Sequence, residues 1–238
     1  MHRPILRFVR REHRLLFLLA VGAGLAFGFI QLASEMQEGD TAAFDRSILT
    51  ALRTPGDLAV PIGPHWLLPA MTDITALGGT TVLTLVSFLA IAFLALRGRW
   101  RQAAVAAAAT GGGALFGVTL KSLFARARPE IVPHLVEVNS LSFPSGHSLN
   151  SAIVYLTLAA LVARSFTELR LRAFVIGVAA MLVLLIGTSR LYLGVHYPTD
   201  VLGGWSVGAA WALMVGVVAA RLQRDRTIEP PTKAEESV

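Results

Sequence analysis

The chain has 238 residues, of which 54% are hydrophobic and 15% charged, and its mean hydropathy is +0.62. Because a soluble domain carries about a quarter charged residues, this composition excludes an ordinary soluble domain and indicates an integral membrane protein. No cysteine is present, which excludes disulfides and thiolate metal sites but leaves the cellular compartment open.

Six segments are apolar enough to cross a bilayer, given that a membrane helix needs roughly 20 apolar residues. They cover residues 15–34, 74–96, 102–120, 148–163, 173–189 and 201–220, the fourth and fifth being short. The first is too long for the apolar core of a cleaved signal peptide, and no small-residue cleavage site follows it. The sequence therefore predicts an all-α integral membrane protein with one six-span domain, residues 1–220. The polar segment 221–238 is predicted to be a disordered tail.

The basic residues predict how these spans are oriented. Most of the 21 Lys and Arg lie before the first span, after the second, after the fourth and after the sixth. These segments share one side of the membrane, which the positive-inside rule assigns to the cytoplasm. Both termini, with the tail, are thus predicted to be cytoplasmic. The cytoplasmic position of most basic residues accounts for the net charge of +6, so no nucleic-acid partner is expected.

The segment between the first two spans, Glu35 to Asp73, is rich in Pro, Gly and Asp. Within it, Phe44 to Leu52 has the pattern of a short amphipathic helix lying on the membrane surface. Asp73 is interpreted as an interfacial cap, because a lipid-facing carboxylate would be costly. No chemistry is assigned to this segment.

The third span ends in a basic stretch, Lys121 to Pro129, on the predicted outer face. Cations near a helix end can simply extend to the interface, although such residues belong mostly on the inner face. Lys121 and Arg128 would lie on one helix stripe if the helix continued to Pro129, and with Arg190 they could converge on a dianion. At an effective dielectric of ~20, each contact at ~4 Å would be worth about 4 kcal/mol.

The fourth span opens with Phe143-Pro144-Ser145-Gly146-His147-Ser148. Ser145 is suited to cap the helix, and Gly146 would let an anion approach the first N–H groups of the helix. His147 could protonate a departing oxygen. Alone, His147 would equally fit an ordinary interfacial histidine.

The turn between the last two spans holds Arg190, His196 and Asp200. Pro198 suits the first turn of a helix, which would put His196 at the helix mouth and Asp200 one turn inside. A carboxylate there could fix the imidazole tautomer and leave the other ring nitrogen free to attack. The alternative is an interfacial turn whose polar side chains lie at headgroup level. All three basic or histidine-bearing blocks fall on the predicted outer face, so they can meet in one pocket.

These blocks resemble the tripartite signature of the type 2 phosphatidic acid phosphatase superfamily. Lys-x6-Arg-Pro covers Lys121 to Pro129, Pro-Ser-Gly-His covers Pro144 to His147, and Ser-Arg-x5-His-x3-Asp covers Ser189 to Asp200. All three are complete and in the family's order, and agreement of three spaced blocks is far more specific than one motif.

The resemblance implies a role for each matching residue. His196 would attack phosphorus and form a phosphohistidine, Asp200 would orient it, and His147 would protonate the leaving lipid oxygen and then activate water. The residues implied to hold the phosphoryl oxygens are Lys121, Arg128, Ser145, Gly146 and Arg190. No metal and no other cofactor is implied. Arg126, His134 and Glu137 match no motif position and are interpreted as solvated loop residues.

The resemblance predicts a lipid phosphatase in the cytoplasmic (inner) membrane of a bacterium, with its site facing the periplasm or cell exterior. Undecaprenyl diphosphate and phosphatidylglycerol phosphate are the expected lipid substrates. Three alternatives stay open: a lipid phosphotransferase using the same histidine, a vanadate-dependent haloperoxidase with the same anion site, and a non-catalytic channel or scaffold. The sequence does not predict an oligomeric state.

Overall fold

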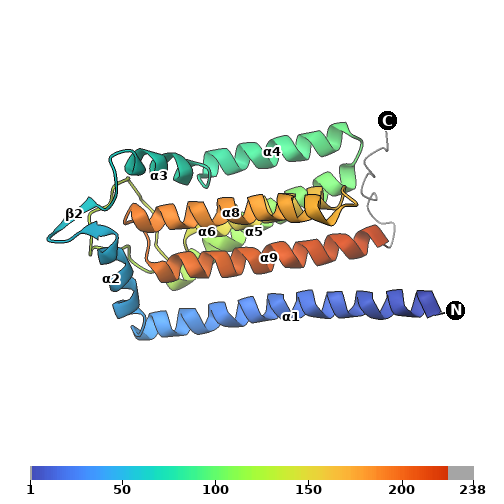
Figure 1. Cartoon of the computed structure of the whole chain (residues 1–238), viewed down its shortest axis with the longest axis horizontal. Coiled ribbons are helices and arrows are strands. Elements are labelled where there is room, and N and C mark those ends of the chain that lie inside the picture. Colours follow the sequence, from blue (N-terminus) through green and yellow to red (C-terminus); the bar gives the residue numbers. More distant parts are fainter. Residues whose placement is uncertain (1, 225–238) are drawn as a thin grey trace.

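The computed structural model describes residues 2–224, which form a bundle of long, roughly aligned helices (Figure 1). Short elements gather at one end of the bundle, here called the hairpin end: α2 (Ala42–Ala51), the antiparallel strands β1 (Arg53–Thr54) and β2 (Asp57–Pro61), and α3 (Leu67–Ala76). The long helix α1 (His2–Glu38) begins, and α9 (Pro198–Arg224) ends, at the opposite end.

The remaining helices complete the bundle in chain order. They are α4 (Thr80–Leu96), α5 (Trp100–Phe124), α6 (Gly146–Ser151), a π-helical turn η1 (Ala152–Leu156), α7 (Thr157–Ala163) and α8 (Leu169–Tyr192). The predominantly helical architecture predicted from the sequence is confirmed. The two-stranded hairpin departs from an all-α fold and lies within the Pro-, Gly- and Asp-rich segment between the first two predicted spans.

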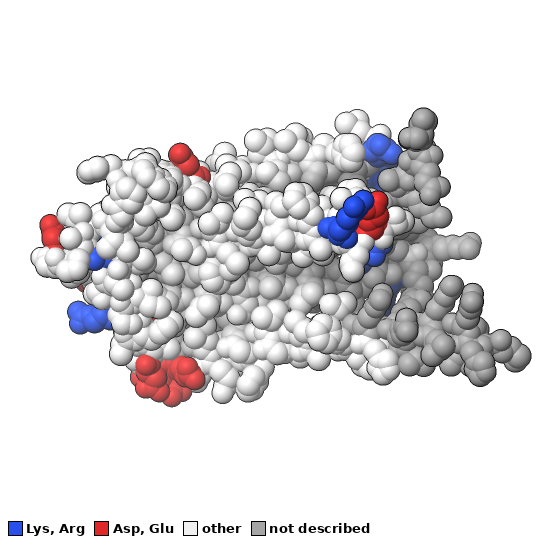
Figure 2. Space-filling view, viewed as in Figure 1, with Lys and Arg blue, Asp and Glu red and all other residues white. Residues whose placement is uncertain are grey.

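Five helical segments among residues 2–224 are long and apolar enough to span a membrane, and a bent pair supplies a sixth. The five are Leu15–Glu38, Trp100–Phe124, Gly146–Ala163, Leu169–Tyr192 and Pro198–Gln223. Figure 2 shows charged side chains mainly toward the two ends of the bundle, with a broad uncharged middle. Such a belt matches the hydrocarbon core of a bilayer.

The second predicted span, 74–96, is not one straight helix. α3 and α4 meet at an angle of 46°. Between them, the N–H groups of Leu77, Gly78 and Gly79 bond to carbonyls three residues earlier. This tight turn ends α3, and Gly79, with extended backbone angles, starts α4. A pair of glycines beside a tightened turn is a recognised cause of a sharp kink.

The third predicted span also ends differently from the expectation. α5 stops at Phe124 because Ala125 adopts a left-handed conformation with φ 46°. The chain then runs without helix through Arg128, whose backbone is disfavoured from helix by Pro129. The helix does not continue to Pro129, so the condition for Lys121 and Arg128 to share a helix stripe is not met.

Several boundaries shift by a few residues. The fourth, fifth and sixth spans begin earlier than predicted, and α9 continues through Arg224, so residues 221–224 do not belong to a disordered tail. The remaining tail residues, 225–238, lie outside the described part of the chain. α2 occupies the position of the predicted amphipathic helix at 44–52.

The α6–α9 contact shows how closely the helices approach around the core. A Cβ added at Gly208 of α9 would lie 2.7 Å from the Leu149 carbonyl oxygen and 2.6 Å from the Ala152 Cβ. Small residues at such crossings let two backbones meet.

At the hairpin end, Phe143 stacks on Phe29 at 5.5 Å and meets Phe124 edge-on, which anchors the chain before α6 to α1 and α5.

We expect Gly208→Ala to destabilise the protein by about 1–3 kcal/mol, the usual cost of overpacking a tight contact. Gly216→Ala on the same helix is the matched control, because a Cβ there has no neighbour within 4 Å. Thermal unfolding of both variants in detergent provides the measurement. Equal midpoints for the two would contradict the close crossing of α6 and α9.

Candidate active site

The three sequence blocks meet in a pocket of about 300 Å³ at the hairpin end. His196 lines this pocket, and most of the remaining wall consists of seven polar side chains and one glycine. They are Lys121, Arg128, Glu137, Asn139, Ser140, Gly146, His147 and Arg190. The blocks come from the end of α5 and its following loop, the start of α6, and the α8–α9 turn. Residues of the three blocks, separated by up to 75 positions, thus line one cavity.

His196 is held in the turn that joins α8 to α9. Gly194, with φ 73°, ends α8, and the Val195 N–H bonds back to the Arg190 carbonyl. The His196 side chain is only 1% exposed. Its Nδ1 lies 3.2 Å from Asp200 Oδ2, and its Nε2 lies 3.3 Å from Arg128 Nη1. With the proton on Nδ1 donated to Asp200, Nε2 carries the lone pair and lies beside Arg128, which lines the pocket.

The protonation state of His196 follows from its burial. Removing the ring from water lowers the pKa of His196 from 6.5 to about 3, since desolvation disfavours the charged form. Asp200 acts in the opposite direction, while Arg128 and Arg190 lower the pKa further. The imidazole is therefore neutral near pH 7, which is the form in which a histidine can act as a nucleophile or base.

Asp200 is fully buried and has a partner for each oxygen. Oδ2 accepts the Ser142 hydroxyl, the Tyr197 N–H at 2.9 Å and the His196 ring. Oδ1 accepts Nη1 of Arg126 at 2.7 Å. Pro198 begins α9, as predicted, so Asp200 lies in the first turn, where a negative charge is favoured by the helix dipole.

Arg126 is not the solvated loop residue that the sequence suggested. Besides Asp200, its guanidinium donates to Thr199 Oγ1 at 2.7 Å and forms an ion pair with Asp45 of α2 at 2.8 Å. The segment 35–73, expected to carry no chemistry, thus reaches the site through Asp45. One sequence signal was available: Asp45 lies four residues before Leu49, on the apolar face of the amphipathic helix.

The three predicted phosphate-binding cations are held by neutral acceptors. Lys121 Nζ donates to the Leu141 carbonyl at 2.6 Å, and Arg128 donates to the carbonyls of Ser140 and Val195, both at 2.6 Å. Arg190 Nη1 donates to Thr75 Oγ1 at 3.0 Å, while its buried Nε has no partner among the described residues. Because neutral groups hold these cations, their positive charge stays available to an anion.

Ser145 and His147 flank the glycine that opens α6. Ser145 caps the helix as predicted, its Oγ accepting the Ser148 N–H at 3.5 Å and the Ser148 hydroxyl at 3.1 Å. The Ser145 side chain is buried and does not line the pocket, whereas Gly146 and His147 do. In this cap the Ser145 oxygen only accepts, so its hydroxyl proton stays available to donate.

A family model described as the PAP2 superfamily matches residues 102–224. The chain belongs to the PAP2 superfamily. It is 34% identical over 200 residues to phosphatidylglycerophosphatase B of Bacillus subtilis, which covers 83% of this chain and 94% of that protein. It is also 35% identical over 136 residues to decaprenylphosphoryl-5-phosphoribose phosphatase of Mycobacterium tuberculosis, covering 56% and 70% of the two chains.

A solved structure gives the same result for the fold of this PAP2 protein. The crystal structure of a transmembrane PAP2-type phosphatidylglycerolphosphate phosphatase from Bacillus subtilis matches with a TM-score of 0.75 and 32% identity. The match covers 85% of this chain and 98% of that one. The protein is therefore a multi-span membrane hydrolase of the lipid phosphatase type.

Proposed function

We propose that this PAP2 protein removes a phosphate group from a membrane lipid in two steps, through a phosphohistidine on His196. The observation that carries the proposal is the environment of His196, whose Nδ1 is tethered to Asp200 while Nε2 faces a pocket lined by three cations. A nucleophile oriented by a carboxylate next to a binding site for negative charge is the arrangement that phosphoryl transfer requires.

In the first step, Lys121, Arg128 and Arg190 hold the phosphoryl oxygens. Gly146 admits them to the start of α6, where the Ser145 hydroxyl is a further proposed donor. His196 Nε2 attacks phosphorus, the P–N bond forms, and the bond from phosphorus to the lipid oxygen breaks. His147 gives its proton to that oxygen, and Asp200 stabilises the charge that the imidazole ring acquires.

In the second step, water replaces the lipid. The unprotonated His147 takes a proton from water, the new oxygen bonds to phosphorus, and the P–N bond breaks. Inorganic phosphate leaves and His196 returns to its neutral form. Because the cations supply the positive charge that stabilises both transition states, the proposed reaction needs no metal ion and no other cofactor.

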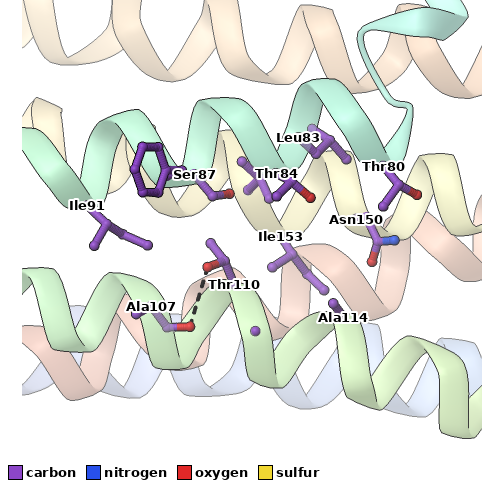
Figure 3. A pocket seen from close by; sticks show the side chains of 13 residues that line it. Thr80, Leu83, Thr84, Ser87, Ile91, Ala107, Thr110, Ala114, Asn150 and Ile153 are labelled. Carbon is purple, nitrogen blue, oxygen red and sulfur yellow. Dashed lines mark hydrogen bonds between the residues drawn. The ribbon is translucent and has the colours of Figure 1, made fainter.

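A cavity that opens to the bundle surface, where the Phe88 side chain is exposed, supports a lipid substrate. It has a volume of about 320 Å³ and lies between α4 and α5, with η1 behind it (Figure 3). Thr80 and Asn150 line both this cavity and the cationic pocket, so the two spaces adjoin. From there it extends to Ile91 and Ala107 among mostly apolar side chains. An acyl or prenyl chain fits this route, with its phosphate in the cationic pocket.

The comparisons support phosphatidylglycerol phosphate as the first substrate to test, because the relative of nearly full coverage is named for that activity. Undecaprenyl diphosphate is the second proposed substrate. The wall of the pocket carries one carboxylate, Glu137, facing three cations, so a phosphate dianion is the group that its charge favours.

The proposed setting is the cytoplasmic membrane of a bacterium, with a single membrane domain built from the described helices. Arginines near the Arg99 and Arg164 loops gather at the end opposite the pocket, and the positive-inside rule assigns that end to the cytoplasm. The pocket then opens at the level of lipid headgroups on the outer leaflet.

Phosphate release by purified protein in detergent with excess EDTA tests the mechanism. We expect release from phosphatidylglycerol phosphate that survives EDTA, is abolished in His196→Ala, and falls about 10²–10⁴-fold in His147→Ala, the usual worth of a general acid. His65→Ala, an exposed histidine outside the pocket, is the matched control. Activity that requires a metal would contradict the proposal, and phosphate transfer to a second lipid without free phosphate would identify a phosphotransferase.

A filled cavity tests the lipid-chain route. Ala107→Phe places a ring in the cavity, whereas Ala108→Phe, next to it, does not touch the cavity lining. Displacing about two methylenes at about 0.8 kcal/mol each should lower kcat/KM for a long-chain lipid roughly tenfold. A water-soluble short-chain phosphate ester should be hydrolysed as before. Equal losses for both esters, or for both variants, would argue against the route.

Single cysteines test the orientation, because the natural chain contains none. Ala59→Cys lies on the exposed hairpin and Thr167→Cys in the exposed loop before α8. A membrane-impermeant maleimide added to intact spheroplasts should label the first and reach the second only after the membrane is permeabilised. The reverse pattern would place the pocket in the cytoplasm.

A further inference from the structure

We propose that Asp45 of α2 and Arg126 are positioning residues that fix Asp200, and through Asp200 the ring of His196, from outside the phosphate pocket. This inference rests on the histidine mechanism proposed above. It assigns a role in the reaction to a helix that ends 142 residues before the α8–α9 turn begins and lies outside the region matched by the family model.

Asp45 is a buried carboxylate whose hydrogen bonds all reach across the fold. Its side chain is 0% exposed. Oδ1 accepts the Thr199 N–H at 3.0 Å, and Oδ2 accepts the Thr199 hydroxyl at 2.8 Å and Nη2 of Arg126 at 2.8 Å. Asp45 therefore caps the first turn of α9 from another helix. A buried charge with this many partners fixes the geometry of each.

Arg126 acts on both oxygens of Asp200. Its Nη1 donates directly to Oδ1 at 2.7 Å. Its backbone carbonyl accepts the Ser142 N–H at 2.8 Å, and the Ser142 hydroxyl donates to Oδ2. The Tyr197 ring covers the guanidinium at 4.0 Å and limits its movement. With both oxygens engaged, the Asp200 carboxylate cannot rotate away from His196 Nδ1.

The charges explain why Asp45 is needed as well as Arg126. The guanidinium lies between two buried carboxylates, one on each side, and binds each through a different nitrogen. Without Asp45, the Arg126 guanidinium would keep Asp200, Thr199 and the Tyr197 ring, which all belong to residues 197–200, and its position would be set from one side. Neither Asp45 nor Arg126 lines the phosphate pocket, so neither is placed to bind substrate.

A purely structural role would make a different prediction. If Asp45 and Arg126 only fastened α2 to the bundle, their loss would lower the unfolding temperature while kcat per folded molecule stayed constant. If they position Asp200, kcat should fall while KM stays nearly constant, because the pocket that binds the phosphate is intact. The separation of kcat from KM therefore distinguishes the two roles.

The test compares Asp45→Asn, Arg126→Gln and Arg126→Lys with Asp40→Asn, the same chemical change at an exposed site just before α2. We expect Asp45→Asn and Arg126→Gln to lower kcat for phosphatidylglycerol phosphate about 10- to 100-fold, with KM within about twofold. Arg126→Lys, which keeps the charge, should recover part of the loss. The two losses should not add in the double variant, because Asp45 and Arg126 hold the same carboxylate and contact each other.

Thr199→Val is a milder variant that removes only the hydroxyl shared by Asp45 and Arg126, and it is expected to lower kcat several-fold even if a charge variant does not fold. An unchanged kcat in Asp45→Asn and Thr199→Val, or losses that add in the double variant, would overturn the inference. His196→Ala is measured alongside. Full activity of His196→Ala would refute the proposed mechanism, whereas an inactive His196→Ala beside a fully active Asp45→Asn would refute only the positioning role.

Discussion

The arrangement of this protein depends on keeping one carboxylate, Asp200, ionised and fixed inside the bundle. An isolated buried carboxylate is strongly unfavourable, and it persists only when charge and hydrogen bonds compensate for the lost water. Here the compensation comes from Arg126, Ser142, the Tyr197 N–H and His196. These partners come from the α5–α6 loop and the α8–α9 turn, so the carboxylate is satisfied only when both segments are in place.

The same need for partners explains how the pocket keeps its positive charge. Lys121 and Arg128 use backbone carbonyls of residues 140–142 and 195 as acceptors, and Arg190 uses a hydroxyl. Carboxylates in those positions would neutralise the cations and leave nothing to attract a phosphate. The acidic partners are instead gathered on the other side of His196, around Arg126. This separation places a neutral histidine between a cationic pocket and an anionic support.

Sequence patterns predicted what depends on local chemistry and missed what depends on contacts between distant segments. The Ser145 cap and the Pro198 start of α9 follow from local backbone preferences, and both were predicted correctly. The end of α5 at Phe124 was not predicted, because the left-handed conformation of Ala125 has no sequence signature. Arg126 was judged a solvated residue because its partner Asp45 is 81 positions away. The one available sequence signal was Asp45 itself, because an aspartate on the apolar face of an amphipathic helix needs a partner from another segment.

The break between α3 and α4 shows that irregular backbone within an apolar bundle is stabilised by hydrogen bonds from neighbouring helices. In hydrocarbon, a carbonyl freed by a kink needs a new partner, and non-helical backbone survives only where protein supplies one. The Leu77 carbonyl accepts the Tyr155 hydroxyl at 2.8 Å, and the Thr75 hydroxyl, two residues earlier, accepts Arg190. Gly78 in this break leaves room for Ile186 and His147, which a Cβ there would contact. Because Thr80 follows directly and joins the cationic pocket to the apolar cavity, the break lies where the headgroup of an amphiphilic substrate would meet its chain.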